Sequence, residues 1–188
     1  MVTDTKTALL DSAERAARAR GFDGFSYADL ADDVGIRKAS IHHHFPTKAA
    51  LSVALMKRYY IDLEKTCAEI DATKTTGRAR LSALIDRYRD ALDGGKSLCL
   101  CVSLSTSRES LPKEVISQIS QFRAMMINWL KHVYAAGQSD GSILDIRDPE
   151  AEAAAALSLL EGAQLAARAE ENPKLFESAL RLMQQRLL

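Results

Sequence analysis

The chain is poor in the residues that interrupt helices or cross-link a fold. Its 188 residues include only nine glycines, four prolines and three cysteines, and aromatic residues make up 6%. Scarce glycine and proline, beside abundant alanine, leucine, arginine and glutamate, favour helices. Three cysteines are an odd number, which excludes a disulfide framework of the kind found in small secreted domains. We therefore expect a reducing, cytoplasmic setting.

The chain also lacks net charge and long apolar runs. Lys and Arg number 25, and so do Asp and Glu, so any attraction to nucleic acid or to an anionic membrane must be local. No window approaches the roughly 18 apolar residues of a membrane span, and the charged amino terminus does not suit a signal peptide. We expect no membrane association. The hydrophobic content of 47% allows one large domain or two small ones with a substantial core.

Apolar residues recur with helical spacing along nearly the whole chain, and no convincing strand alternates with period two. We therefore predict an all-α fold of about nine helices. A glycine, a proline or a polar connector separates each helix from the next. The expected helices are 7–20, 27–34, 37–44, 48–70, 78–92, 98–105, 112–136, 150–169 and 174–188.

The second and third of these helices form a predicted helix-turn-helix at about residues 26–45. Ser26 is a good N-cap with Asp29 three residues later, and Gly35 supplies the flexible turn. No Asp or Glu occurs between Val34 and Ile61, although basic residues are frequent there. This local basic stretch predicts an electrostatic footprint for DNA that the neutral total conceals.

The third helix has side chains suited to the major groove. Arg37 and Lys38 lie at its amino-terminal end, where recognition helices approach base edges, and either can donate to guanine. Ala39 allows close approach and can contact a thymine methyl group, and Ser40 can donate to a base or a phosphate. We therefore predict that this helix reads base sequence.

The stretch GFDGFSYADLADDVGIRKASIHHHFPTKAAL resembles the DNA-binding domain of the TetR family of bacterial repressors. The glycine–aromatic corner, the serine cap, the D-L-A core, the glycine turn, the basic–small pair and the closing lysine agree with the family pattern in register. The match covers the first quarter of the chain densely. The rest agrees in length and helical layout, without a sharp motif.

The resemblance implies further DNA contacts. Ser26 and Tyr27 would lie near the phosphate backbone, and Lys48 would bind phosphate. His42 and His43 stand where the family usually has an aromatic residue that contacts phosphate or sugar. The predicted DNA-binding set is Ser26, Tyr27, Arg37, Lys38, Ala39, Ser40, His42, His43, His44 and Lys48.

The chain departs from the family pattern at two of these positions. Histidine replaces the usual tyrosine at position 42, which leaves a pH-dependent and a pH-independent DNA affinity both open. Arg37 replaces a frequent serine or threonine, so the operator sequence cannot be copied from a relative.

The resemblance also implies a homodimer that binds a palindromic operator in double-stranded DNA and is released by an unidentified small-molecule effector. The resemblance favours repression over activation, because repression is the usual role in this family. We expect residues 1–48 to form the DNA-binding domain and residues 49–188 the effector-binding and dimerisation domain. Candidate pocket residues are Tyr59, Tyr88, Cys99, Ser103, Phe122, Asn128, Trp129, His132 and Gln164. Candidate dimer contacts are Leu157, Leu160, Ala163, Leu180 and Met183.

The histidines, the cysteines and the helical fold each allow another interpretation. Adjacent histidines diverge around a helix, so a metal site at 42–44 is disfavoured, and His44 can be purely structural. Cys99 and Cys101 are interpreted as packing residues, with a sensor for oxidants or electrophiles as the alternative. No catalytic motif, cofactor or metal is expected. A helical protein-interaction module without DNA binding is the remaining alternative.

Overall fold

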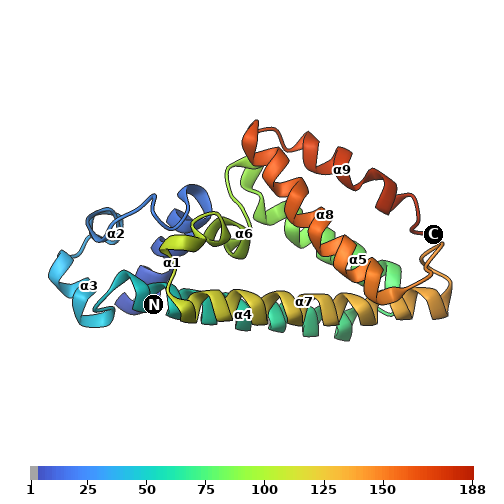
Figure 1. Cartoon of the computed structure of the whole chain (residues 1–188), viewed down its shortest axis with the longest axis horizontal. Coiled ribbons are helices and arrows are strands. Elements are labelled where there is room, and N and C mark those ends of the chain that lie inside the picture. The colour runs from blue at the N-terminus through green and yellow to red at the C-terminus, as the bar shows by residue number, and fades with distance from the viewer. Residues whose placement is uncertain (1–3) are drawn as a thin grey trace. The chain divides into compact units, whose positions relative to one another are not determined.

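The fold is all-α, as predicted, in the computed structural model that describes residues 4–188. Within this part of the chain there are nine α-helices, shown in order in Figure 1. Two short 3-10 turns, at Asp93–Gly95 and Arg108–Ser110, supplement them. The helices are α1 Thr5–Arg20, α2 Tyr27–Val34, α3 Lys38–His44, α4 Lys48–Thr73, α5 Gly77–Ala91, α6 Leu100–Ser105, α7 Lys113–Asp140, α8 Pro149–Ala169 and α9 Lys174–Gln184.

These helices form two compact units. The first runs to Ile61 and also includes Leu100–Gln121, and the second consists of Asp62–Cys99 and Phe122–Leu188. The long helices α4 and α7 therefore contribute residues to both units. The functional boundary after residue 48 stays a prediction, because compactness alone does not say which residues bind DNA.

The first unit is organised around α1. Its buried face packs against α2 and α6, and the hydroxyl of Ser103 on α6 donates to the carbonyl of Ala17 on α1. Leu9 and Ile41 are both 0% exposed, so α1 and α3 each contribute to this core. Arg58 of α4 joins the same unit to α1 through ion pairs with Asp11 and Glu14, at 2.6 and 2.7 Å.

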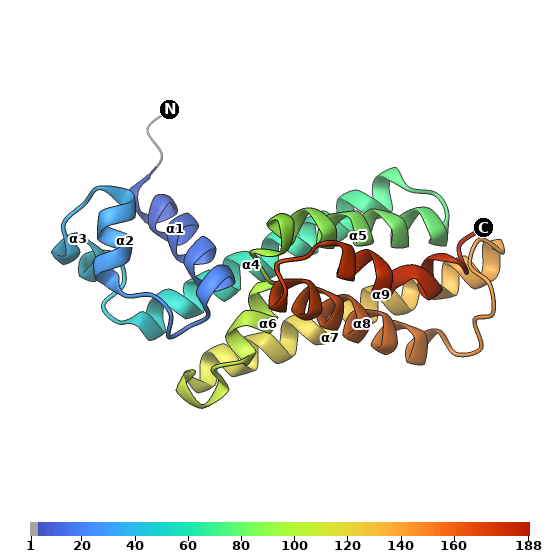
Figure 2. The same cartoon turned by 90° about the horizontal axis from the view of Figure 1, so that it is seen from above.

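In the second unit, α8 and α9 lie side by side (Figure 2). Phe176, Leu180 and Met183 recur at helical spacing on α9 and are buried, which aligns the apolar face of α9 with α8. This apolar face of α9 is therefore covered within the chain and is not available to a partner chain.

Helix α7 is longer than the sequence indicated. The prediction that it ends at residue 136, before Gly137, is wrong, since α7 continues to Asp140. Gly137 lies inside the helix, where a Cβ would come within 2.5 Å of the Ile143 side chain, and the backbone of Gly77 also approaches it closely. Gly137 therefore serves close packing and not helix termination.

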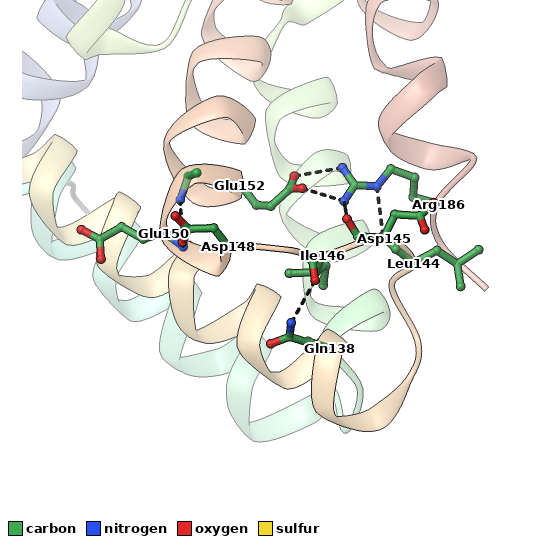
Figure 3. A network of polar contacts seen from close by, with 9 residues as sticks. Gln138, Leu144, Asp145, Ile146, Asp148, Glu150, Glu152 and Arg186 are labelled. Atoms are coloured by element: carbon green, nitrogen blue, oxygen red, sulfur yellow. Dashed lines mark hydrogen bonds and ion pairs between the residues drawn. The ribbon is translucent and has the colours of Figure 1, made fainter.

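The last helix is shorter than predicted, because α9 ends at Gln184 and the terminal residues turn back along the α7–α8 loop. Arg186 is the centre of this contact (Figure 3). Its guanidinium binds the Glu152 carboxylate at 2.7 and 2.9 Å and also donates to the carbonyls of Leu144 and Asp145. These four hydrogen bonds tie the last residues of the chain to the α7–α8 loop and to the first turn of α8.

Candidate nucleic-acid interface

The turn between α2 and α3 is built on one left-handed glycine. Gly35 has φ 73° and ψ 36°, a conformation that other residues adopt only with strain. Its N–H and that of Ile36 both donate to the carbonyl of Ala31, which closes α2 in the manner of a Schellman motif. A Cβ at Gly35 would meet nothing within 4 Å, so the position needs glycine for its backbone angle and not for space.

The start of α2 is fixed by the predicted capping box. The Ser26 hydroxyl accepts from the N–H of Asp29, and the Asp29 carboxylate accepts from the N–H and hydroxyl of Ser26, both at 2.7 Å. Those bonds hold the pKa of the Asp29 carboxyl below its usual value. Asp33 is likewise engaged, because Ser12 and then Arg15 lower the pKa of its carboxyl. Two of the three α2 carboxylates thus have partners within their own unit.

The start of helix α3 carries exposed basic and small residues. Arg37 is its N-cap, and Lys38, Ala39 and Ser40 form its first turn; all four side chains are exposed. Ile41, in the next turn, is 0% exposed and anchors the helix in the core. The four residues predicted to read bases are therefore all accessible, and no carboxylate lies among them.

The three histidines of α3 diverge. His42 is exposed, with Nδ1 3.3 Å from the carbonyl oxygen of Pro46 and its ring edge-on to Tyr27 at a centroid distance of 5.0 Å. The exposed His43 ring lies edge-on to the half-buried His44 ring at 5.5 Å. Across residues 4–188 no group of three His, Cys, Asp or Glu side chains is arranged to hold a metal ion.

Tyr27 does not have the exposed position that a phosphate contact through its side chain needs. The residue is 7% exposed, and its hydroxyl donates to the carbonyl of Phe45 at 2.9 Å. Burial raises the pKa of its phenol to about 12. The side chain therefore joins the start of α2 to the end of α3, and only the backbone of this residue is left for a direct DNA contact.

Lys48 is held more tightly than a simple phosphate ligand. Its ammonium donates to the carbonyl of Phe25 and lies 4.7 and 4.2 Å from the ring centroids of Phe22 and Phe25. Burial lowers the pKa of this amine, an effect that Asp23 and Asp29 partly oppose. This aromatic enclosure was not predicted, although the two phenylalanines of the corner before α2 supply it.

Replacing Lys48 by methionine is expected to lower the free energy of unfolding by about 2 kcal/mol, because the charged hydrogen bond and the ring contacts are lost while the apolar stem is kept. Thermal unfolding of the purified protein measures this change. Lys57→Met on the same helix is the control, because Lys57 is exposed. Equal thermal stability of the two variants would show that the enclosure contributes nothing.

Arg58 is a further basic residue whose charge is paired within the first unit. It belongs to the basic stretch between residues 34 and 61, but its ion pairs with Asp11 and Glu14 neutralise it within the first unit. The basic surface available to DNA is therefore smaller than the sequence pattern indicates. A signal for this was present in the two acidic residues of the first helix, but their distance from Arg58 in the chain hid the pairing.

The predicted effector residues fall into different environments. Gln164 is 0% exposed and has both ends of its amide engaged: it accepts from the N–H of Cys99 at 2.7 Å and donates to the carbonyl of Tyr88 at 2.9 Å. These three residues therefore lie together. Asn128 and His132 are exposed on α7. The remaining candidates are the buried Ser103, Phe122 and Trp129 and the half-buried Tyr59.

The polar groups of two further candidates are also occupied. The Trp129 indole N–H donates to Asp71 at 2.9 Å, and the Ser103 hydroxyl donates to Ala17. With Gln164, these residues hold helices together. The hydrogen bonds of these side chains point to a role in stabilising the fold more directly than to a role in ligand recognition.

The side chains of the predicted dimer contacts are covered within the same chain. All five are at most 9% exposed, since they form the packing between α8, α9 and the rest of the second unit. The residues are Leu157, Leu160, Ala163, Leu180 and Met183. The assignment of α8 and α9 to a dimer interface, which the resemblance implies, stays a prediction.

Comparison with known proteins connects this geometry to one family. Residues 9–55 match the family model described as bacterial regulatory proteins, tetR family. The chain is 28% identical over 145 residues to the HTH-type transcriptional repressor KstR2 of Rhodococcus jostii, covering 77% of this chain and 71% of that protein. It is 26% identical over 183 residues to the repressor NemR of Escherichia coli, covering 94% and 90%.

A solved structure shares the whole architecture. A transcriptional regulator of the TetR family from Agrobacterium tumefaciens superimposes with a TM-score of 0.90 at 29% identity, over 97% of this chain and 96% of that one. The similarity extends over the second unit as well, where the sequence alone showed no sharp motif. No helix among the described residues is both long and apolar enough to cross a membrane.

Proposed function

This chain belongs to the TetR family of bacterial regulatory proteins, and from that premise we propose that it represses transcription by binding a palindromic operator as a homodimer. The observation that supports this best is the exposed surface of α3. Arg37, Lys38, Ala39 and Ser40 are accessible together, while Ile41 fixes the helix to the core. A recognition helix needs a buried residue that holds it in the domain and exposed basic and small residues that can reach the bases. The protein acts in the cytoplasm and has no catalytic role.

The histidines and Lys48 take supporting roles in this proposal. His42 and His43 are exposed at the end of α3 and approach the phosphate backbone, and His44 braces the helix. Ser26 supplies backbone and hydroxyl groups at the start of α2, where Tyr27 sets the spacing to α3. Lys48 adds positive charge near the same corner while it holds Phe25.

The outer face of α8 supports dimerisation. Between Ala153 and Ala167 the only charged residue is Glu161, which is 7% exposed and pairs with Arg123. The exposed positions on this stretch are small or apolar: Ala154, Ala155, Ser158, Gly162, Leu165 and Ala166. Such a face lets a second helix approach closely, and it adjoins α9, where Leu182 is 76% exposed.

Dimerisation is also needed for recognition. One helix-turn-helix reads only half of a palindrome, and two of them must lie about 34–36 Å apart to enter successive major grooves. An effector that favours a dimer with another spacing lowers operator affinity by linkage. We propose that a small molecule releases the protein from DNA in this way.

Lys38→Ala is expected to lower operator affinity about 10- to 100-fold and to relax selectivity, because a base contact of this kind contributes about 1–3 kcal/mol. Fluorescence anisotropy with an operator selected from genomic fragments, and with a library of related sites, measures affinity and selectivity together. Lys65→Ala is the matched control, since its side chain is 75% exposed on α4. Retained selectivity in Lys38→Ala would remove this residue from the base-reading set.

A salt titration tests the function as a whole. Binding to a duplex through phosphate contacts releases counterions, so affinity must fall steeply as salt rises. A helical protein-interaction module would bind no duplex even at low salt, and that result would refute the proposal.

A further inference from the structure

A pocket in the first unit lies between α4 and the beginning of α7. Its lining comes from two neighbouring turns of α4 and one of α7: Met56, Lys57, Tyr60, Ile61, Gln118 and Gln121. None of these belongs to the predicted effector set. We propose that this pocket binds a small amphipathic carboxylate, such as a single-ring aromatic acid that carries a hydroxyl group. As a route of regulation, this proposal rests on the DNA-binding function proposed above.

The walls of the pocket are apolar. Met56 is 0% exposed and forms its inner side. Ile61 is 59% exposed, and it also lines the pocket. The body of the ligand must therefore be apolar, because a fully hydrated molecule would gain nothing from these two side chains.

The charge of the pocket selects an anion. Lys57 is its only charged lining residue, and neither α4 before Asp62 nor the lining part of α7 supplies a carboxylate. Among the described residues no acidic side chain forms an ion pair with Lys57. A ligand carboxylate beside this ammonium would gain a charge-assisted hydrogen bond that the protein itself does not provide.

The opposite side of the pocket needs a hydrogen-bond donor. Gln118 Oε1 is buried and has no hydrogen-bond partner among residues 4–188. A buried acceptor without a partner is unfavourable, and natural structures usually satisfy it with a side chain, a water molecule or a ligand. A hydroxyl group on the ligand would satisfy Gln118, while Gln121 already donates to Ser117 and is less available.

The volume limits the size of the ligand. The pocket has a volume of about 200 Å³. This is below the range of about 300–1,000 Å³ typical of pockets for drug-sized molecules. One substituted ring fits this space, whereas a polycyclic compound or a long acyl chain does not.

The position of the pocket connects it to DNA binding. Met56, Lys57, Tyr60 and Ile61 lie on α4, which begins four residues after α3 ends, and the pocket belongs to the same compact unit as α2 and α3. A ligand that bridges α4 and α7 would therefore restrict the movement of α4 within that unit. Where DNA-bound and DNA-free forms differ in α4, the ligand changes operator affinity by linkage.

Isothermal titration calorimetry of the full chain without DNA tests the pocket directly, with benzoate, 3-hydroxybenzoate and neutral methyl benzoate as probes. We expect one site per chain. Kd should rise at least about 10-fold for the ester and for Lys57→Ala, because each change removes a charged hydrogen bond. Lys65→Ala should leave Kd unchanged. Gln118→Met should abolish the preference for 3-hydroxybenzoate over benzoate and leave benzoate binding intact.

The proposal is overturned if neither carboxylate binds, if the ester binds as well as benzoate, or if Lys57→Ala and Lys65→Ala give the same Kd. Operator affinity of the ligand-free protein is measured separately. Absent duplex binding would refute the proposed function while the calorimetry still decides the pocket. Carboxylate binding that requires Lys57 but leaves operator affinity unchanged would confirm the site and refute its regulatory role.

Discussion

Gly77→Ala is expected to lower the free energy of unfolding by about 3 kcal/mol, one of the largest effects of adding a single methyl group to this chain. A Cβ at Gly77 would lie 2.3 Å from the N atom of Gly137, 2.4 Å from its Cα and 2.7 Å from the carbonyl oxygen of Val133. All three are backbone atoms, so no side chain can rotate away. Helix α5 must instead separate from α7, which also weakens the hydrogen bond from the Gly77 N–H to Asp140.

Thermal unfolding measures this effect. For a chain of this size a loss of about 3 kcal/mol lowers Tm by roughly 6–12 °C. Ala68→Val is the control, because it adds bulk at an exposed position of α4 and should cost only the helix propensity of valine, about 0.5 kcal/mol. A Tm for Gly77→Ala within 2 °C of the wild type, an interval of about 1 kcal/mol or less, would show that the helices separate freely.

This close contact explains which parts of the fold the sequence could and could not predict. The capping box at Ser26 and the turn at Gly35 depend on residues within one or two helical turns, so their patterns are local and were predicted correctly. Gly137, inside α7, instead packs closely against Gly77, which is 60 positions away in the chain. The rule that glycine ends a helix uses only neighbouring residues, so it cannot predict such a long-range contact.

In the candidate sites, too, local features could be predicted from the sequence and contacts between distant elements could not. The exposed surface of α3 follows from helical periodicity and from one buried anchor, Ile41, and both can be seen in the sequence. The enclosure of Lys48, the pairing of Arg58 and the pocket beside Lys57 each bring together separate elements, which no single stretch reveals. Periodicity also cannot say whether an apolar helix face packs within its own chain or against a second one.

Introducing charge on the outer face of the α8–α9 pair is expected to produce the largest loss of operator binding. In the double variant Leu165→Glu and Leu182→Glu, two carboxylates replace leucines that are 43% and 76% exposed in the single chain. Burying four such charges across a symmetric interface is strongly unfavourable, while the fold of each chain should be preserved because neither leucine belongs to its core.

The expected result is a folded monomer whose operator affinity is at least about 100-fold lower, because the second half-site is no longer bound by a linked partner. Light scattering after gel filtration gives the mass, and anisotropy gives the affinity. Ile61→Glu, at a residue that is 59% exposed on α4, is the control and should remain dimeric. A double variant that stays dimeric would refute the α8–α9 interface. A monomer that keeps full operator affinity would instead show that one helix-turn-helix suffices, contrary to the need for paired half-sites on which dimerisation rests.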